Sequence, residues 1–229
     1  MSKLFQGTTD SAGPYETRVL SRSWLTEDAF EIRFSRPPGL QFAPGQRLRF
    51  IRNEVERDYT PVSSPQDEGI DFLVRSVKGG LFSSVLASAR EGDPFQFTGP
   101  HGYFRFYPSE RPPVFVATGT GVAPFVSMAR AGVKDFILLH GVRRSLDLYY
   151  DPLLRKAARL YVPCLSTLRD PKEGVPGGFA GRVTGYLANQ LASGAYDFYL
   201  CGNADMIRDV ILLVDQKFLD SLVYTEPFS

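Results

Sequence analysis

Cysteine is scarce in this sequence: Cys164 and Cys201 are the only two among 229 residues. Two thiolates are too few for an iron–sulfur cluster with four cysteine ligands, and no CxxC pair occurs. Two isolated cysteines do not make a disulfide framework either. We therefore expect neither a metal site nor a disulfide-stabilised fold.

Long apolar runs and a strong net charge are also absent. No segment approaches the roughly 20 apolar residues of a membrane-spanning helix, and residues 1–13 lack the apolar region of a signal peptide. We therefore expect a soluble, cytoplasmic protein with a flexible N-terminus over residues 1–14. The formal net charge of +1 gives no global reason to expect nucleic-acid or membrane binding.

Arginine, by contrast, is concentrated in the first quarter of the chain. Solvated strand faces would account for this pattern. A docking face for an acidic partner, with one arginine kept for a phosphate, would also account for it, and both interpretations stay open. The arginines concerned are Arg18, Arg22, Arg33, Arg36, Arg47, Arg49, Arg52 and Arg57.

The first half of the sequence predicts a β domain. Residues 30–34 alternate apolar and polar side chains, as a half-buried strand does. Short strands separated by proline- and glycine-containing turns favour a closed barrel or a sandwich. After Gly80, Leu81, Val85 and Leu86 are spaced for one face of a short helix. The other strands expected here are 48–51 and 72–77.

A proline-rich linker over residues 107–113 leads into a second half of different character. Continuous apolar runs, typical of buried parallel strands, alternate there with helical segments. This alternation predicts a parallel sheet with helices on both faces. The expected strands are 114–117, 136–139, 160–165 and 198–201, and the expected helices are 123–131, 151–159, 183–191 and 204–218.

The sharpest motif opens this second half, where a strand runs into Thr118-Gly119-Thr120-Gly121 and a helix follows. Glycines let the backbone approach a ligand closely, and Pro124 falls where the first turn of a helix tolerates proline. Free N–H groups at a helix start attract an anion. We therefore expect a pyrophosphate site at the carboxyl end of a strand, with a tight turn that binds nothing as the alternative.

Two weaker motifs lie in the first half. Arg57-Asp58-Tyr59-Thr60 follows a predicted strand and offers a guanidinium for a phosphate, a flat ring and a hydroxyl. Residues 78–86 run from a strand through Gly79 and Gly80 to Ser83 and Ser84, either of which could be an N-cap or a phosphate donor. Taken alone, each motif is equally typical of a surface turn or a capped helix.

Together and in this order, the motifs resemble those of the ferredoxin–NADP reductase superfamily. That family uses RxY(S/T), GGxxSxxL, GxGxAPF and CGxxxM motifs, the last of which is matched by residues 201–206. The resemblance covers about residues 15–229. It implies a flavin-binding, antiparallel Greek-key β-barrel over residues 15–109. A C-terminal α/β domain with a parallel sheet would follow over residues 110–229 and bind a nicotinamide nucleotide.

The resemblance also assigns roles to individual residues. Thr60 would place its hydroxyl near flavin N5, Cys201 would lie near the nicotinamide, and Glu226 would sit close to the reacting centre. An ordinary buried cysteine stays an alternative for Cys201, as does terminal packing for Phe228. His101 and His140 are expected to serve structure, although His140 could touch the nucleotide. The flavin-binding residues would be Arg57, Tyr59, Thr60, Gly79, Gly80, Leu81, Ser83, Ser84 and Phe228, and the nucleotide-binding residues would be Thr118, Gly119, Thr120, Gly121, Pro124, Arg143, Gly202 and Met206.

The identity of the coenzymes is only partly indicated. The resemblance favours FAD over FMN. A 2′-phosphate on the nucleotide requires serine or arginine partners, and Ser166 and Arg169, with Arg143 and Arg144, offer them. Asp170 argues for NADH instead, but the balance favours NADPH.

The function implied is a flavin-dependent oxidoreductase that passes hydride from NAD(P)H to FAD N5. Its electrons would go to a separate ferredoxin, flavodoxin or oxygenase component, because two cysteines cannot hold a fused plant-type ferredoxin cluster. The arginine-rich segment suits an acidic partner. Two alternatives stay open: a flavin- or nucleotide-binding regulatory subunit without turnover, and a protein that binds no cofactor.

Overall fold

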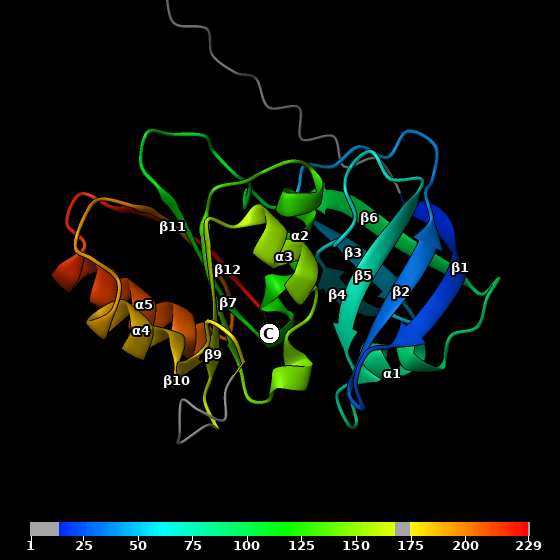
Figure 1. Cartoon of the computed structure of the whole chain (residues 1–229). Helices are drawn as coiled ribbons and strands as arrows, with labels where there is room; N and C mark the ends of the chain where they lie inside the picture. The colour runs from blue at the N-terminus through cyan, green and yellow to red at the C-terminus, as the bar shows by residue number, and fades with distance from the viewer. Residues whose placement is uncertain (1–13, 168–174, 229) are drawn as a thin grey trace, which may run out of the picture.

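The computed structural model describes residues 14–167 and 175–228 of the chain (Figure 1). The first half forms an antiparallel sheet of six strands in the order β4-β3-β6-β1-β2-β5. Its two outer strands meet, because Pro61 pairs with Phe72 and the Val62 N–H donates to the Asp71 carbonyl at 2.8 Å. The sheet is thereby closed into the expected Greek-key barrel, with β6 between β3 and β1. The elements are β1 (Tyr15–Trp24), β2 (Ala29–Ser35), β3 (Arg47–Arg52), β4 (Val55–Tyr59), β5 (Gly69–Arg75), α1 (Leu81–Ser88) and β6 (Pro94–His101).

Aromatic side chains fill the barrel. Along β2, Phe30, Ile32 and Phe34 are fully buried, so the alternation expected for residues 30–34 is confirmed. The Phe50 ring lies 5.2 Å from the Phe34 and Phe72 rings, centroid to centroid. Each buried ring of this size stabilises the fold by roughly 1.5–3 kcal/mol.

Several sequence-based expectations for the barrel were wrong in detail. The motif follows β3, the strand expected over 48–51, but Arg57, Asp58 and Tyr59 themselves belong to a further strand, β4, which was not expected. Strand β4 has no apolar alternation of its own, so it is a strand because it pairs with β3. The strand expected over 72–77 runs from Gly69 to Arg75 (β5). Of the residues expected on the buried face of α1, Leu86 is buried and Val85 packs against the core, but Leu81 is 68% exposed and Phe82 makes the core contact instead.

The second half forms a six-stranded parallel sheet in the order β10-β9-β8-β7-β11-β12. Its faces carry different residues of the same strands: Phe115 packs with Phe125 of α2, whereas Val116 packs in a cluster with Val210 of α5. The expected sheet with helices on both faces is confirmed. The elements are β7 (Pro113–Thr118), the 3-10 turn η1 (Gly119–Val122), α2 (Ala123–Arg130), β8 (Ile137–Val142), the 3-10 turn η2 (Ser145–Asp147), α3 (Asp151–Ala157), β9 (Leu160–Leu165), β10 (Phe179–Ala180), α4 (Val183–Asn189), β11 (Asp197–Gly202), α5 (Ala204–Lys217) and β12 (Leu222–Pro227).

Helix α2 lies between the parallel sheet and the barrel (Figure 1). The Ser127 hydroxyl donates to the Ser63 carbonyl at 2.7 Å, and Arg130 donates to the Val62 carbonyl at 3.1 Å. Val62 of the barrel side also belongs to the buried cluster that contains Phe125. A shared apolar core and buried hydrogen bonds therefore hold the two sheets in a defined arrangement.

Candidate functional site

The end of β4 presents a flat aromatic ring. The Tyr59 ring packs edge-on against Phe50 and Phe72, with centroids 5.8 and 6.4 Å apart. Burial raises the pKa of Tyr59 to about 12, with Arg57 opposing the shift. Thr60, the next residue, is buried. A neutral phenol ring fixed from the core side suits stacking on a planar ring.

The start of α1 is a candidate phosphate site. Gly80 is the N-cap of α1, and no side chain of the described residues caps this helix start. The first N–H groups of the helix are therefore available to an anion. The exposed Arg57 guanidinium donates to the Glu56 carbonyl at 2.6 Å and forms no ion pair within the part of the chain that the structure describes.

The expectation that Ser83 or Ser84 could be the N-cap of α1 was wrong. Both residues lie inside the helix. The Ser83 hydroxyl accepts the Val77 N–H at 3.2 Å, and the Ser84 hydroxyl donates to the Gly80 carbonyl at 2.5 Å. A Cβ on Gly80 would lie 2.6 Å from the Ser83 oxygen and 3.0 Å from the Val77 carbonyl oxygen, so this position has little room for a side chain.

The glycine-rich turn after β7 is packed tightly against the end of β11. A Cβ on Gly121 would lie 2.5 Å from the Cys201 carbonyl oxygen, which is backbone and cannot move aside. Gly119 differs, because it has φ +53° and open space beside it. Pro124 lies in the first turn of α2, as expected, and no side chain of the described residues caps that helix. The Ala123 N–H at the start of α2 donates to the Thr120 carbonyl and Pro124 has no N–H, so an anion at this turn would have to be met by the backbone of η1.

The end of β11 is joined to the same turn. The Thr118 hydroxyl accepts the Asn203 N–H at 2.9 Å. Gly202 has φ +129°, and a Cβ there would lie 2.3 Å from the Thr118 hydroxyl. Asn203 accepts the Asp205 and Met206 N–H groups and so caps α5.

These two strand ends mark the point where the sheet reverses its direction of winding. From β7 the chain proceeds to β8 and β9 on one side, whereas β12 follows β11 on the other. The connections leave in opposite directions, an arrangement that in open parallel sheets forms a crevice at the carboxyl ends of the two strands, here β7 and β11. In open parallel sheets of this kind, ligands bind at this crevice.

The C-terminal strand brings a carboxylate to this crevice. In the register of β12 beside β11, Glu226 lies opposite Cys201. Burial raises the pKa of Glu226 above its usual value, and Arg47 opposes the shift. Burial also raises the pKa of Cys201 well above its ordinary value, and the nearby Glu226 charge adds to this. The Phe228 N–H donates to the Gly202 carbonyl at 2.9 Å, so the tail is fixed against β11.

Arg47 is a residue that the motifs did not single out for this site. Its guanidinium is ion-paired with the Glu226 carboxylate, and its Nε lies 2.8 Å from Asp58 Oδ2. Asp58 belongs to the same short motif as Tyr59 and Thr60. Arg47 therefore connects the barrel motif to the end of β12. In the sequence, Arg47 is only one of many arginines in the first quarter of the chain, so nothing marked it as a site residue.

His140 is a buried residue that supports the glycine-rich turn after β7. It is fully buried, with Nε2 3.1 Å from the Gly119 carbonyl and Nδ1 3.1 Å from the Tyr161 hydroxyl. A carbonyl can only accept, so Nε2 carries the proton and Nδ1 accepts from Tyr161. Burial lowers the pKa of His140 to about 4. The structural role expected for His140 is consistent with this geometry.

The predicted 2′-phosphate residues are only partly brought together. The Ser166 N–H and hydroxyl both donate to the Val142 carbonyl, at 3.0 and 3.3 Å, which places Ser166 beside Arg143. Arg144 is instead paired with Asp147 at 3.1 Å. Arg169 lies outside the described residues, as does Asp170.

Two further predicted residues lie in different surroundings. Met206 is buried in the core between α5 and the sheet. Leu81 is exposed beside the predicted phosphate site. The structure thus gathers Thr118, Gly119, Thr120, Gly121, Cys201, Gly202, Glu226 and Phe228 around one crevice and leaves Met206 in the core.

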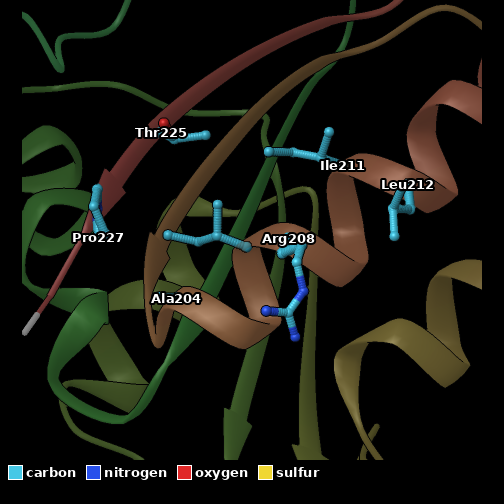
Figure 2. Close-up of a pocket in the computed structure, with 7 residues that line it drawn as sticks. Ala204, Arg208, Ile211, Leu212, Thr225 and Pro227 are labelled. Atoms are coloured by element: carbon cyan, nitrogen blue, oxygen red, sulfur yellow. The ribbon is translucent and has the colours of Figure 1, made fainter.

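A cavity of about 320 Å³ lies between α5 and β12 (Figure 2). Apart from Arg208 and Thr225, its lining is apolar, so it offers little for phosphate or ring recognition. It reaches the tail only at Pro227. The lining residues are Ala204, Ile207, Arg208, Ile211, Leu212, Thr225 and Pro227.

Two classes of feature are missing from the part of the chain that the structure describes. No group of three or more His, Cys, Asp or Glu side chains could hold a metal ion there. No helix there has the length and apolar character that crossing a membrane requires.

Comparison with known proteins identifies both domains. Residues 17–106 match the oxidoreductase FAD-binding domain family, and residues 115–211 match the oxidoreductase NAD-binding domain family. Over 218 residues, 88% of this chain, the sequence is 34% identical to the electron transfer component of toluate 1,2-dioxygenase from Pseudomonas putida. The chain spans 63% of that relative's length and 64% of the length of the reductase component of propane 2-monooxygenase from Rhodococcus jostii.

Solved structures agree with this fold. The cytochrome P450 reductase GcoB from Amycolatopsis superposes with a TM-score of 0.80 at 25% identity, covering 94% of this chain and 69% of that chain. A ferredoxin NADP+ reductase from Neisseria gonorrhoeae, solved with bound FAD and NADP, gives 0.78 at 21% identity, covering 94% and 99%. The latter likeness shows the fold alone.

Proposed function

The chain belongs to the ferredoxin–NADP reductase superfamily, and we propose that it is a flavin-dependent oxidoreductase. In this proposal it passes hydride from NAD(P)H to FAD and electrons to a separate redox protein. One observation carries the proposal. The Tyr59–Thr60 motif of the barrel and the crevice at the ends of β7 and β11 are joined by the contacts of Arg47 with Asp58 and Glu226.

The residues of the barrel fit a flavin. The Tyr59 ring provides a stacking surface, and the uncapped start of α1 and the Arg57 guanidinium provide donors for phosphate. FAD stays favoured over FMN by family resemblance. A bound flavin supplies the hydride-accepting and one-electron chemistry, and the protein supplies binding, orientation and electrostatics.

The proposed catalytic residues differ in what they offer. Cys201 is fully buried and protonated, so it acts as a small polarizable neighbour and not as a thiolate. Glu226 supplies a carboxylate held by Arg47, and Thr60 supplies a buried hydroxyl. These three groups, with the glycine turn, position the nucleotide and exclude water.

The ends of β8 and β9 support one choice of nucleotide. Ser166 and Arg143 lie together there, and Arg143 forms no ion pair with any residue in 14–167 or 175–228. A free guanidinium next to a serine suits a 2′-phosphate. We therefore propose NADPH as the preferred donor over NADH.

The proposed acceptor is an acidic electron-transfer protein such as a ferredoxin, a flavodoxin or an oxygenase component. Several arginines of the barrel are already paired within the chain, for example Arg33 with Asp71 at 3.5 Å. Arg52 is exposed at the end of β3 and is better placed to meet a partner. A docking rate that falls steeply with ionic strength is expected. The proposed domain boundary, between residues 109 and 110, falls in the interval between the two family matches.

The test is the visible spectrum of the purified protein, before and after anaerobic addition of NADPH and then of NADH. Flavin bands that bleach, and bleach faster with NADPH, are the expected result. Bands that neither nucleotide bleaches would favour a regulatory subunit without turnover. A protein that takes up neither FAD nor FMN on reconstitution would overturn the proposal.

A further inference from the structure

The Glu226 carboxylate depends on a residue of the other domain. Its side chain is 13% exposed, and among the described residues Arg47 is its only ion-pair partner. β12 is the outer strand of its sheet, so its pairing with β11 fixes it from one side only. The end of this strand therefore needs a contact on its other flank to hold the carboxylate in one place.

The residues around Arg47 leave room for its ion pair with Glu226. Gly102 has φ +88°, and a Cβ there would lie 3.3 Å from Arg47 Nη1 and 3.8 Å from Glu226 Oε2. The Gln46 amide donates to the Gly102 carbonyl at 3.1 Å and fixes this loop. The glycine thus leaves room for the ion pair while the loop closes over it.

Arg47 and Arg49 differ in what their loss would leave behind. Arg49 holds Asp58 with two hydrogen bonds, from Nε at 2.7 Å and from Nη2 at 3.0 Å. Asp58 therefore keeps a partner if Arg47 is removed, whereas Glu226 does not. For a largely buried carboxylate, loss of the paired cation leaves the cost of desolvation uncompensated. The carboxylate would take up a proton or turn toward solvent.

We propose that Arg47 is a positioning residue of the hydride-transfer site, which ties the end of β12 to the barrel and holds the Glu226 carboxylate charged beside Cys201. This inference rests on the proposed function for its kinetic consequence. Its structural part, the tie between β12 and the barrel, holds independently of turnover. The ion pair acts across the domain interface, so it orients the nucleotide side of the crevice relative to the flavin side.

The test compares R47M, R47K and E226Q with the matched control R49M, which leaves the Arg47–Glu226 pair intact. Hydrogen exchange of the segment 222–228 is measured first, because the Phe228 N–H is protected by its bond to Gly202. Exchange faster by about tenfold is expected in R47M and E226Q, from the interaction energy typical of contacting charged pairs. R49M should exchange as the wild type does, and R47K should recover part of the protection.

Rapid-mixing kinetics then separates binding from hydride transfer. In R47M the limiting rate of flavin reduction should fall about tenfold, while the apparent Kd for the nucleotide and the flavin content change little. The double variant R47M/E226Q should be no slower than the slower single variant, because both remove the same contact. Additive losses, or R47M and R49M with equal effects, would overturn the inference.

The two proposals fail in different ways. If the wild type binds flavin but neither nucleotide reduces it, the proposed function fails, and the exchange data still decide whether Arg47 fixes β12. If the wild type is reduced normally and R47M matches it in both exchange and rate, only the role of Arg47 is overturned. If R47M does not fold, the variants E226Q and R47K test the same Arg47–Glu226 ion pair by the same two measurements.

Discussion

Replacement of His140 by glutamine should remove a pH-dependent part of the stability. The imidazole is fully buried between the Gly119 carbonyl and the Tyr161 hydroxyl, and this burial disfavours its charged form. A glutamine amide can still donate to the Gly119 carbonyl but does not titrate. The variant thus tests the buried neutral imidazole separately from its hydrogen bond.

The direction and size of this change in unfolding free energy with pH follow from proton linkage. Burial lowers the pKa of His140 from 6.5 to about 4 in the folded protein. Between these two values His140 is protonated in the unfolded chain but not in the folded protein. The unfolding free energy therefore decreases as the pH falls from about 6.5 toward 4. Between pH 7.5 and 5 this single group should cost the wild type about 2 kcal/mol of unfolding free energy.

The assay is urea unfolding of wild type and H140Q at several pH values in that range, followed by circular dichroism. The carboxylates titrate in both proteins, so the difference between the two unfolding free energies isolates His140. That difference should shift in favour of H140Q by about 2 kcal/mol on acidification. A difference that stays constant from pH 7.5 to 5 would refute the buried, neutral imidazole.

Other substitutions give simpler outcomes. Gly121→Ala should lower the unfolding free energy by about 1–3 kcal/mol in urea titrations, because its Cβ meets the Cys201 carbonyl at 2.5 Å. Gly185→Ala should raise it by about 0.5–1 kcal/mol, since this α4 glycine has only ordinary contacts at 3.4 Å and beyond. Ser127→Ala should cost about 1–3 kcal/mol, because the buried Ser63 carbonyl loses its donor. The Cys201 thiol should resist alkylation in the native protein and react after unfolding, as mass spectrometry would show, because burial raises its pKa.

The sequence predicted the fold well where side chains repeat with a clear period. The continuous runs of β7, β9 and β11 are buried on both faces, so they were visible as parallel strands. β1 was missed because only Thr17 and Val19 of its ten residues are buried. β4 and β12 were missed for a related reason: pairing with a neighbouring strand, and not their own apolar pattern, makes them strands.

The candidate site was predictable in its parts but not in its assembly. Short motifs located Tyr59, Gly119 and Cys201, because turns and strand ends have local signatures. The ion pair between Arg47 and Glu226 joins residues 179 positions apart and depends on how the barrel packs against the parallel sheet. No local pattern contains this information. The N-cap of α1 was misassigned because Gly80 supplies the backbone geometry while Ser83 turns back to Val77.

The glycines of the site do not all argue for a ligand. Gly121 and Gly202 are required by packing, because a Cβ on either would collide with the neighbouring strand end whether or not a nucleotide binds. Gly119 is different: its left-handed backbone faces open space, so no neighbour explains it. The case for nucleotide binding therefore depends on Gly119 and the turn η1, because at the start of α2 the Ala123 N–H already donates to the Thr120 carbonyl and Pro124 has no N–H. His140 contacts the Gly119 carbonyl from the buried side, so the conformation of this turn is fixed from within the protein and does not require a ligand to hold it.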